Sequence, residues 1–158
     1  MISRLIQILR ALKTPQCRVI PIVPEARIPS KGSAEAAGCD LSSAENMTIP
    51  AHGRALVHTG IRIAPPRGCH IEVRPRSGLA LKYGITVLNT PGTIDADYRG
   101  EIMVILFNTS DEDFYIRCGD RIAQAIVMRH EDAIWTRVES FDNTERGCGG
   151  FGSSGIHS

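Results

Sequence analysis

Residues 101–127 read EIMVILFNTSDEDFYIRCGDRIAQAIV, and this stretch decides the fold class. Its runs rich in β-branched and aromatic residues are 101–108, 114–116 and 122–127, and the turn sequences between them are 110–113 and 118–120. Short runs of this composition, separated by Asp, Ser and Gly, are typical of β-strands joined by turns. The stretch therefore predicts successive strands.

The same pattern of short β-branched runs and turns begins at residue 18. Further runs of this kind occur at 18–23, 47–49, 54–59, 60–63, 70–73, 85–88 and, beyond the opening stretch, 135–139. Turn residues punctuate them at a spacing near ten, and no long helical period interrupts them. The pattern predicts an all-β sandwich or barrel.

The 158-residue chain has the length of one ordinary domain. We expect an N-terminal extension at 1–14, a β-barrel catalytic domain at 15–142 and a glycine-rich arm at 143–158. The arm contains five glycines in the nine residues that follow Arg146, which is a composition typical of a flexible tail.

Charge and hydropathy exclude several functions. Eighteen Lys and Arg residues against 17 Asp and Glu residues give a net charge of +1, so no strong positive field favours nucleic-acid binding. No apolar stretch approaches the ~20 residues that span a bilayer, so we expect no stable membrane insertion. Five widely spaced cysteines form no CxxC pair, which indicates reduced thiols rather than a metal cluster.

The first residues are basic and amphipathic. Apolar residues recur at helical spacing, at Ile2, Leu5, Ile6, Leu9 and Leu12. Three interpretations stay open: a packing helix, an organelle-targeting presequence and a membrane-surface anchor. We expect a cytoplasmic protein, with a nuclear or mitochondrial location as the alternative that this N-terminus suggests.

Several short segments carry candidate chemistry. Asp95 and Asp97 stand two residues apart, either as a site that engages a cation or water, or as a polar turn with an Asp97–Arg99 ion pair. Arg76 and Ser77 lie in a tight turn where both side chains can face a phosphate, although a capping serine would look the same. Each segment alone is a weak signal.

Taken together and in order, the segments resemble the five motifs of the homotrimeric dUTPase (deoxyuridine 5'-triphosphate nucleotidohydrolase) family. The resemblance covers about 18–155, and its motifs are AGCDL at 37–41, PRSGLA at 75–80, GTIDADYRGEI at 92–102, GDRIAQ at 119–124 and RGCGGFGSSG at 146–155. It implies a jelly-roll-like β-barrel and a homotrimer with active sites between subunits. It also implies Mg²⁺-assisted cleavage of dUTP to dUMP and pyrophosphate, which keeps uracil out of DNA and supplies dUMP for thymidylate synthesis.

The resemblance further implies roles for individual residues. Asp95 would activate the attacking water with Gln124 nearby, and Asp40 would hold Mg²⁺ through its waters. Tyr98 would lie under the deoxyribose, while Asn89, in a hairpin over 85–95, would read uracil. The implied substrate-binding residues are Arg76, Ser77, Gly78, Asn89, Gly92, Thr93, Ile94, Asp95, Tyr98, Arg146, Phe151, Gly152, Ser153 and Ser154. The last five of these would form a lid that grips the γ-phosphate and stacks on uracil.

Two alternatives remain. A dCTP deaminase would share the barrel, but the complete lid motif and Tyr98 disfavour it. A regulator that binds dUTP and switches a protein partner is compatible with intact motifs.

Overall fold

The computed structural model describes residues 14–151. The predicted helix over 1–14, apart from Thr14, therefore lies outside the described residues. Within them the strands are β1 (Arg18–Pro21), β2 (Ser30–Lys31), β3 (Cys39–Ser42), β4 (Met47–Ile49), β5 (Arg54–Ala64), β6 (Cys69–Arg74), β7 (Ile85–Val87), β8 (Gly92–Ile94), β9 (Glu101–Asn108), β10 (Phe114–Ile116) and β11 (Arg121–Arg129). One short helix, α2 (Ser77–Tyr83), connects β6 to β7. The predicted all-β class is confirmed.

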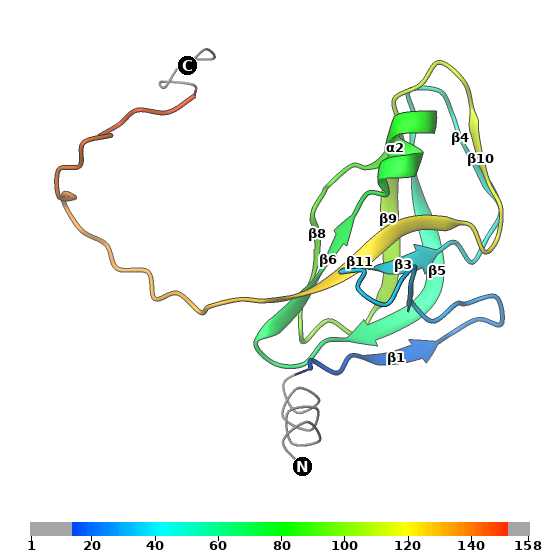
Figure 1. Cartoon of the computed structure of the whole chain (residues 1–158), viewed down its shortest axis with the longest axis horizontal. Coiled ribbons are helices and arrows are strands. Elements are labelled where there is room, and N and C mark those ends of the chain that lie inside the picture. Colours follow the sequence, from blue (N-terminus) through cyan, green and yellow to red (C-terminus); the bar gives the residue numbers. More distant parts are fainter. Residues whose placement is uncertain (1–13, 152–158) are drawn as a thin grey trace.

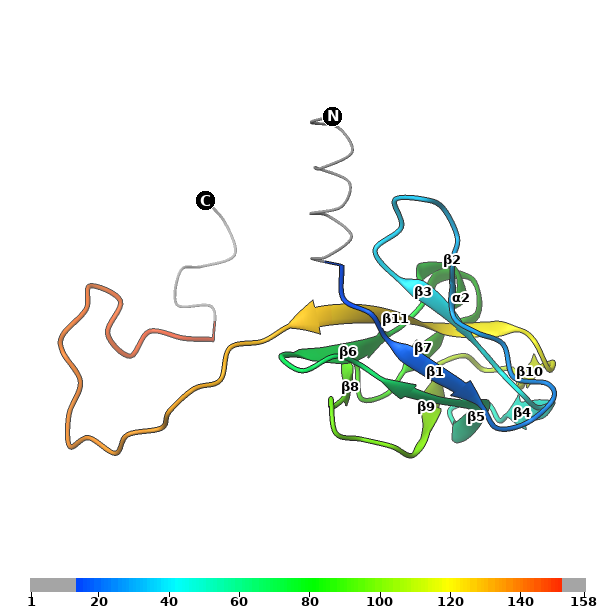
Figure 2. The same ribbon diagram turned by 90° about the horizontal axis from the view of Figure 1, so that it is seen from below.

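Two main sheets face each other (Figures 1 and 2). One has the strand order β1-β5-β9-β7, and the other has the order β2-β3-β11-β6-β8. A small pair, β10 with β4, closes one end. Every strand pairing is antiparallel, as in a jelly-roll-like barrel.

The core lies between the two sheets and consists almost wholly of aliphatic side chains. Its fully buried members include Leu41, Ile49, Val57, Ile61, Ile85, Ile102, Leu106, Ile116 and Ile122. Along β6 buried residues alternate with partly exposed ones, because successive side chains of a strand point to opposite faces of the sheet. The alternation leaves polar side chains free to build a site on the outer face.

One strand differs from the sequence-based expectation. The runs 54–59 and 60–63 form a single strand, β5, whose register against β9 shifts between His58 and Arg62. Gly60 sits in this irregularity with φ of 68°, a left-handed conformation that glycine adopts without strain.

The segment after β11 extends away from the barrel (Figures 1 and 2). The predicted strand over 135–139 does not form, and Ile134, Trp135 and Phe141 are 96%, 94% and 88% exposed. The last strand ends at Arg129, before the expected barrel boundary at 142. The sequence pattern was that of a strand, but a strand needs a partner edge, which its own chain does not provide here.

None of the helices formed by residues 14–151 is long and apolar enough to cross a membrane.

Candidate active site

The first polar groove lies on the outer face of the five-stranded sheet, beside α2. Its volume is about 250 Å³, and its lining includes Asp40, Arg76, Ser77, Gly78, Arg121 and Gln124. Ladder register explains the meeting of distant segments: Gln124 of β11 lies directly opposite Asp40 of β3, so both side chains point to the same face.

Asp40 is held between two arginines. Arg76 Nε lies 3.0 Å from Oδ1, and Arg121 Nη1 donates to Oδ2 at 3.0 Å. Arg76 also donates from Nη1 to the backbone carbonyl of Arg121 at 3.0 Å. The carboxylate therefore orients two guanidinium groups at the groove, and Arg121 is a site residue that the sequence-based reasoning missed.

The Gln124 amide is held by one hydrogen bond and lies close against Gly38. Its Nε2 donates to the Pro75 carbonyl at 2.8 Å. A Cβ atom on Gly38 would lie 2.6 Å from Gln124 Oε1, so glycine at position 38 allows the close approach. Both neighbours belong to segments that the sequence singled out, yet their contact with Gln124 depends on strand pairing.

The second groove is on another part of the barrel. Its volume is about 290 Å³, and it is lined by Leu56, Asn89, Thr93, Ile94, Asp95, Tyr98, Glu101, Met103 and Ile105. Gly92 is buried here, and a Cβ atom on it would lie 3.3 Å from Asn89 Nδ2. The groove thus gathers apolar side chains, an amide, a hydroxyl, two carboxylates and an aromatic ring.

The predicted hairpin over 85–95 is wrong. Strand β7 pairs with β9 in the four-stranded sheet, whereas β8 pairs with β6 in the five-stranded sheet. The connection crosses between sheets and includes Pro91, which has no backbone N–H to donate to a ladder. Asn89, in the connection between β7 and β8, nevertheless lines the same groove as Asp95, which directly follows β8.

The turn after β8 is closed by backbone contacts. Tyr98 N donates to the Asp95 carbonyl at 3.2 Å, and Arg99 Nη1 donates to the Ala96 and Tyr98 carbonyls at 2.7 Å. No Asp97–Arg99 ion pair is found among the described side chains, so that reading of the turn is wrong. Arg99 is instead committed to carbonyl oxygens.

Glu101 is the charged residue with the most contacts in the second groove. Its Oε1 accepts from Gly60 N at 2.8 Å, and its Oε2 lies 2.9 Å from His58 Nδ1. Although burial opposes ionisation most strongly, these hydrogen bonds leave the pKa of Glu101 below its ordinary value. The same contact raises the pKa of His58.

The two grooves share no residue and are well separated in one chain. Strand β8 lies two positions from β11 in the sheet. Ladder spacings of ~4.8 Å between strands and ~3.3 Å along them put the Asp95 and Gln124 Cα atoms roughly 16 Å apart. Within a single chain these two side chains therefore line separate grooves.

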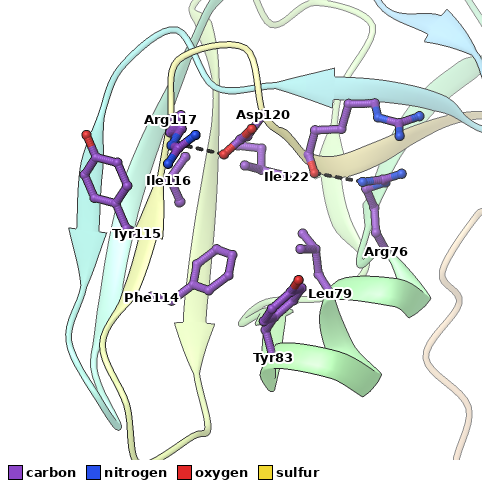
Figure 3. A pocket seen from close by; sticks show the side chains of 10 residues that line it. Arg76, Leu79, Tyr83, Phe114, Tyr115, Ile116, Arg117, Asp120 and Ile122 are labelled. Atoms are coloured by element: carbon purple, nitrogen blue, oxygen red, sulfur yellow. Dashed lines mark hydrogen bonds between the residues drawn. The ribbon is translucent and has the colours of Figure 1, made fainter.

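A larger cavity lies next to the first groove (Figure 3). It measures about 510 Å³ between α2 and β10, and Leu79 and Tyr83 of α2 face Phe114 of β10 there. Arg76 and Arg121 border both this cavity and the first groove. Neither Asp95 nor Gln124 lines it, so the candidate site lies in the two smaller grooves.

The arm carries the remaining candidate residues. Arg146 Nε donates to the Gly149 carbonyl at 2.9 Å within a local turn, and the Phe151 side chain is fully exposed. Neither residue lines either groove of its own chain. Gly152, Ser153 and Ser154 lie outside the described residues.

The antiparallel barrel thus carries one groove with two arginines, which suits phosphate groups, and a separate groove with apolar side chains and the Tyr98 ring. The chain belongs to the dUTPase family, whose model matches residues 24–155. It is 56% identical to the deoxyuridine 5'-triphosphate nucleotidohydrolase of Wolinella succinogenes over 144 residues, which cover 91% of this chain and 97% of that protein. It is 55% identical to the Candida albicans protein of that name over 134 residues, covering 84% of this chain and 83% of the relative.

Solved structures agree with this assignment. The dUTPase of Staphylococcus bacteriophage 80alpha, described with dUPNHPP, superposes with a TM-score of 0.84 at 27% identity, covering 90% of this chain and 100% of that one. The dUTPase of phage phi11 of S. aureus, described with a structural Mg(II) ion, gives a TM-score of 0.74 at 23% identity, covering 80% and 98%. At that identity the second likeness shows the fold alone.

Proposed function

We propose that this protein hydrolyses dUTP to dUMP and pyrophosphate. The observation that carries the proposal is that the two grooves have different linings, each suited to a different part of a nucleotide. One is lined by Arg76, Arg121 and Gln124 and suits phosphates; the other holds Asn89, Asp95 and Tyr98 and suits a base, a sugar and a water. Together with membership of the dUTPase family, this supports dUTP as the substrate.

The base and sugar would occupy the second groove. The Asn89 amide would form hydrogen bonds with the edge of uracil. Neighbouring backbone N–H and C=O groups would form the remaining hydrogen bonds to the base. Cytosine presents the reversed donor and acceptor pattern at that edge, so it would leave these groups unpaired and bind much more weakly. Tyr98 would lie against the deoxyribose, where its ring excludes a 2′-hydroxyl by contact.

Asp95 would act as the general base. Its carboxylate accepts a proton from water as the water oxygen bonds to the α-phosphorus, and the bond from that phosphorus to the bridging oxygen breaks. The pyrophosphate leaves with the electron pair of that bond. The described residues that line the second groove include no Lys, Arg or His, so no cation of that lining competes for the Asp95 carboxylate.

The first groove would hold the phosphate chain. Arg76 and Arg121 supply two guanidinium groups, Ser77 supplies a hydroxyl, and Gln124 an amide near the α-phosphate. Because Asp40 already fixes both guanidinium groups, little side-chain freedom is lost when a triphosphate binds.

The donor set fits Mg²⁺ that arrives with the triphosphate. Residues 14–151 contain no cluster of three or more His, Cys, Asp or Glu side chains able to hold a metal directly. Mg²⁺ commonly keeps its waters and binds through one or two carboxylates plus substrate phosphates. Each Asp40 oxygen receives one arginine and keeps a lone pair that can accept from a metal-bound water. When bound, the ion would neutralise charge on the phosphates and the leaving pyrophosphate.

A homotrimer would bring the two grooves together. The separation of about 16 Å between the Asp95 and Gln124 Cα atoms, estimated from ladder spacings, supports a site whose two halves come from different copies. The exposed Ile134, Trp135 and Phe141 offer apolar surface that a neighbouring copy would cover. Arg146, Phe151, Gly152, Ser153 and Ser154 would then close over a site that is not in their own chain.

The cellular role follows from the reaction. Removing dUTP keeps uracil out of DNA, and the dUMP produced supplies thymidylate synthesis. We propose that the activity is cytoplasmic, with the nucleus or mitochondrion as the alternative location that the basic N-terminus at 1–14 suggests. The barrel at 15–142 would be the catalytic unit and 143–158 its lid.

The test is a substrate panel with Mg²⁺. Pyrophosphate release is measured from dUTP, dCTP, dTTP and UTP, with ammonia release from dCTP followed in parallel. We expect pyrophosphate from dUTP alone. Ammonia release from dCTP would contradict the proposal and show a dCTP deaminase. A folded protein that releases neither product from any of the four nucleotides would favour the regulator.

A further inference from the structure

The Tyr98 side chain folds back over its own chain. Its hydroxyl donates to the Glu101 carbonyl at 3.1 Å, and the side chain is 39% exposed in the second groove. A Cβ atom built on Gly100 would lie 2.2 Å from the Tyr98 hydroxyl oxygen and 2.5 Å from Cζ. The ring edge therefore rests on the space where any other residue would carry a side chain.

Glycine is not needed at position 100 for its backbone. The positive-φ glycines of the described chain are Gly60, Gly68, Gly84, Gly119 and Gly147. Gly100 is not among them, so alanine fits its backbone conformation without strain. What position 100 requires is clearance for the Tyr98 ring.

Glu101, the residue after Gly100, holds the Tyr98 hydroxyl in place. Its carbonyl accepts the Tyr98 hydroxyl, while its carboxylate accepts from the backbone N–H of Gly60 and contacts His58. Gly60 lies in the irregular part of β5, where the ladder is broken between His58 and Arg62. The Glu101 carboxylate thus holds the start of β9 against the irregular part of β5 through these two contacts.

We infer that Gly100 and Glu101 are positioning residues that set the depth of the Tyr98 ring in its groove, and so the room left for the substrate sugar. The inference rests on the proposed function. The chain at 100–101 fills the inner side of the ring, so a methyl group at position 100 must push the ring outward, into the space where the sugar would bind. The three atoms nearest to the added Cβ all belong to the Tyr98 side chain and none to Asp95, so we expect the general base to keep its place.

The Gly100→Ala variant is the direct test. We expect the KM for dUTP to rise at least about tenfold, because a displacement of order 1 Å in a substrate contact is costly. The turnover number should change much less, since the general base is unmoved. Circular dichroism and the melting temperature establish that the barrel is folded.

A double-mutant cycle with Tyr98→Ala separates this role from a general structural one. If Gly100 acts through the ring, Gly100→Ala should change KM less than about twofold in the Tyr98→Ala background. An equal rise in both backgrounds would overturn the inference. So would an unchanged KM in the single variant.

Glu101 has a matched pair of variants. Glu101→Ala removes the anchor and should raise the KM for dUTP several-fold, whereas Glu101→Gln keeps an acceptor for Gly60 N–H and should raise the KM less. Equal behaviour of the two variants would contradict the anchor role. Wild-type protein is assayed alongside: absence of dUTP hydrolysis there defeats the proposed function, whereas active wild type with an indifferent Gly100→Ala defeats this inference alone.

Discussion

Replacing Asp95 by asparagine is expected to lower the rate of dUTP hydrolysis by about 10²–10⁴-fold, the usual contribution of a positioned general base. Asparagine has nearly the same shape as aspartate but cannot take the proton from water. Asp95 is exposed and follows β8, so the exchange leaves the core unchanged. We therefore expect the KM for dUTP and the melting temperature to stay close to those of the wild type.

Asp97→Asn is the matched control for this variant. Asp97 belongs to the same turn and is also exposed, but it does not line the second groove. Removing its charge should leave turnover within about twofold of the wild type, as for surface substitutions in general. An Asp95→Asn protein that hydrolyses dUTP at the full rate would exclude Asp95 as the base.

Ending the chain after Glu145 is the second change with a large expected effect. It removes Arg146 and Phe151, which lie beyond the barrel and contribute nothing to the buried core. The loss of a closing segment that orients the substrate and excludes water should lower kcat/KM by about 10²-fold or more. The melting temperature and the oligomeric state, measured by calorimetry and light scattering, should not change.

A chain that ends at Gly155 serves as the control, because it keeps the whole RGCGGFGSSG motif and loses only the last three residues of the arm. Arg146→Ala and Phe151→Ala then divide the effect between phosphate contact and base stacking. Full activity in the chain that ends at Glu145 would show that the arm is not part of the site.

Local sequence patterns predicted the fold class well, since alternating burial and turn residues are properties of short segments. The β9, β10 and β11 strands appear where 101–127 indicated them. The strand predicted at 135–139 failed because its stability depends on a partner edge that no local pattern encodes. The hairpin over 85–95 failed for a related reason, as only the global topology sends β7 and β8 to different sheets.

The candidate site could be predicted as residue types but not as contacts. Arg121 stands three residues before Gln124 in a segment already singled out, yet its ion pair with Asp40 depends on the pairing of β11 with β3. Gly38 beside Gln124 and Gly100 beside Tyr98 matter for the side chain they lack, which becomes visible only in three dimensions. The available signal in the sequence was a glycine close to a candidate site residue, which can indicate that another group occupies the space of the missing side chain.

The central claim is that one dUTP-hydrolysing site takes Asp95 from one copy of the chain and Arg76 from another. Two separately inactive variants, Asp95→Asn and Arg76→Ala, are coexpressed with different tags, and the mixed oligomers are purified through both tags. Every trimer purified in this way holds both kinds of copy, so in a ring-shaped trimer about a third of the sites would combine an intact Asp95 with an intact Arg76. The account predicts that mixed oligomers regain dUTP hydrolysis to that order while each pure variant stays inactive. Mixed oligomers as inactive as their parents would contradict it.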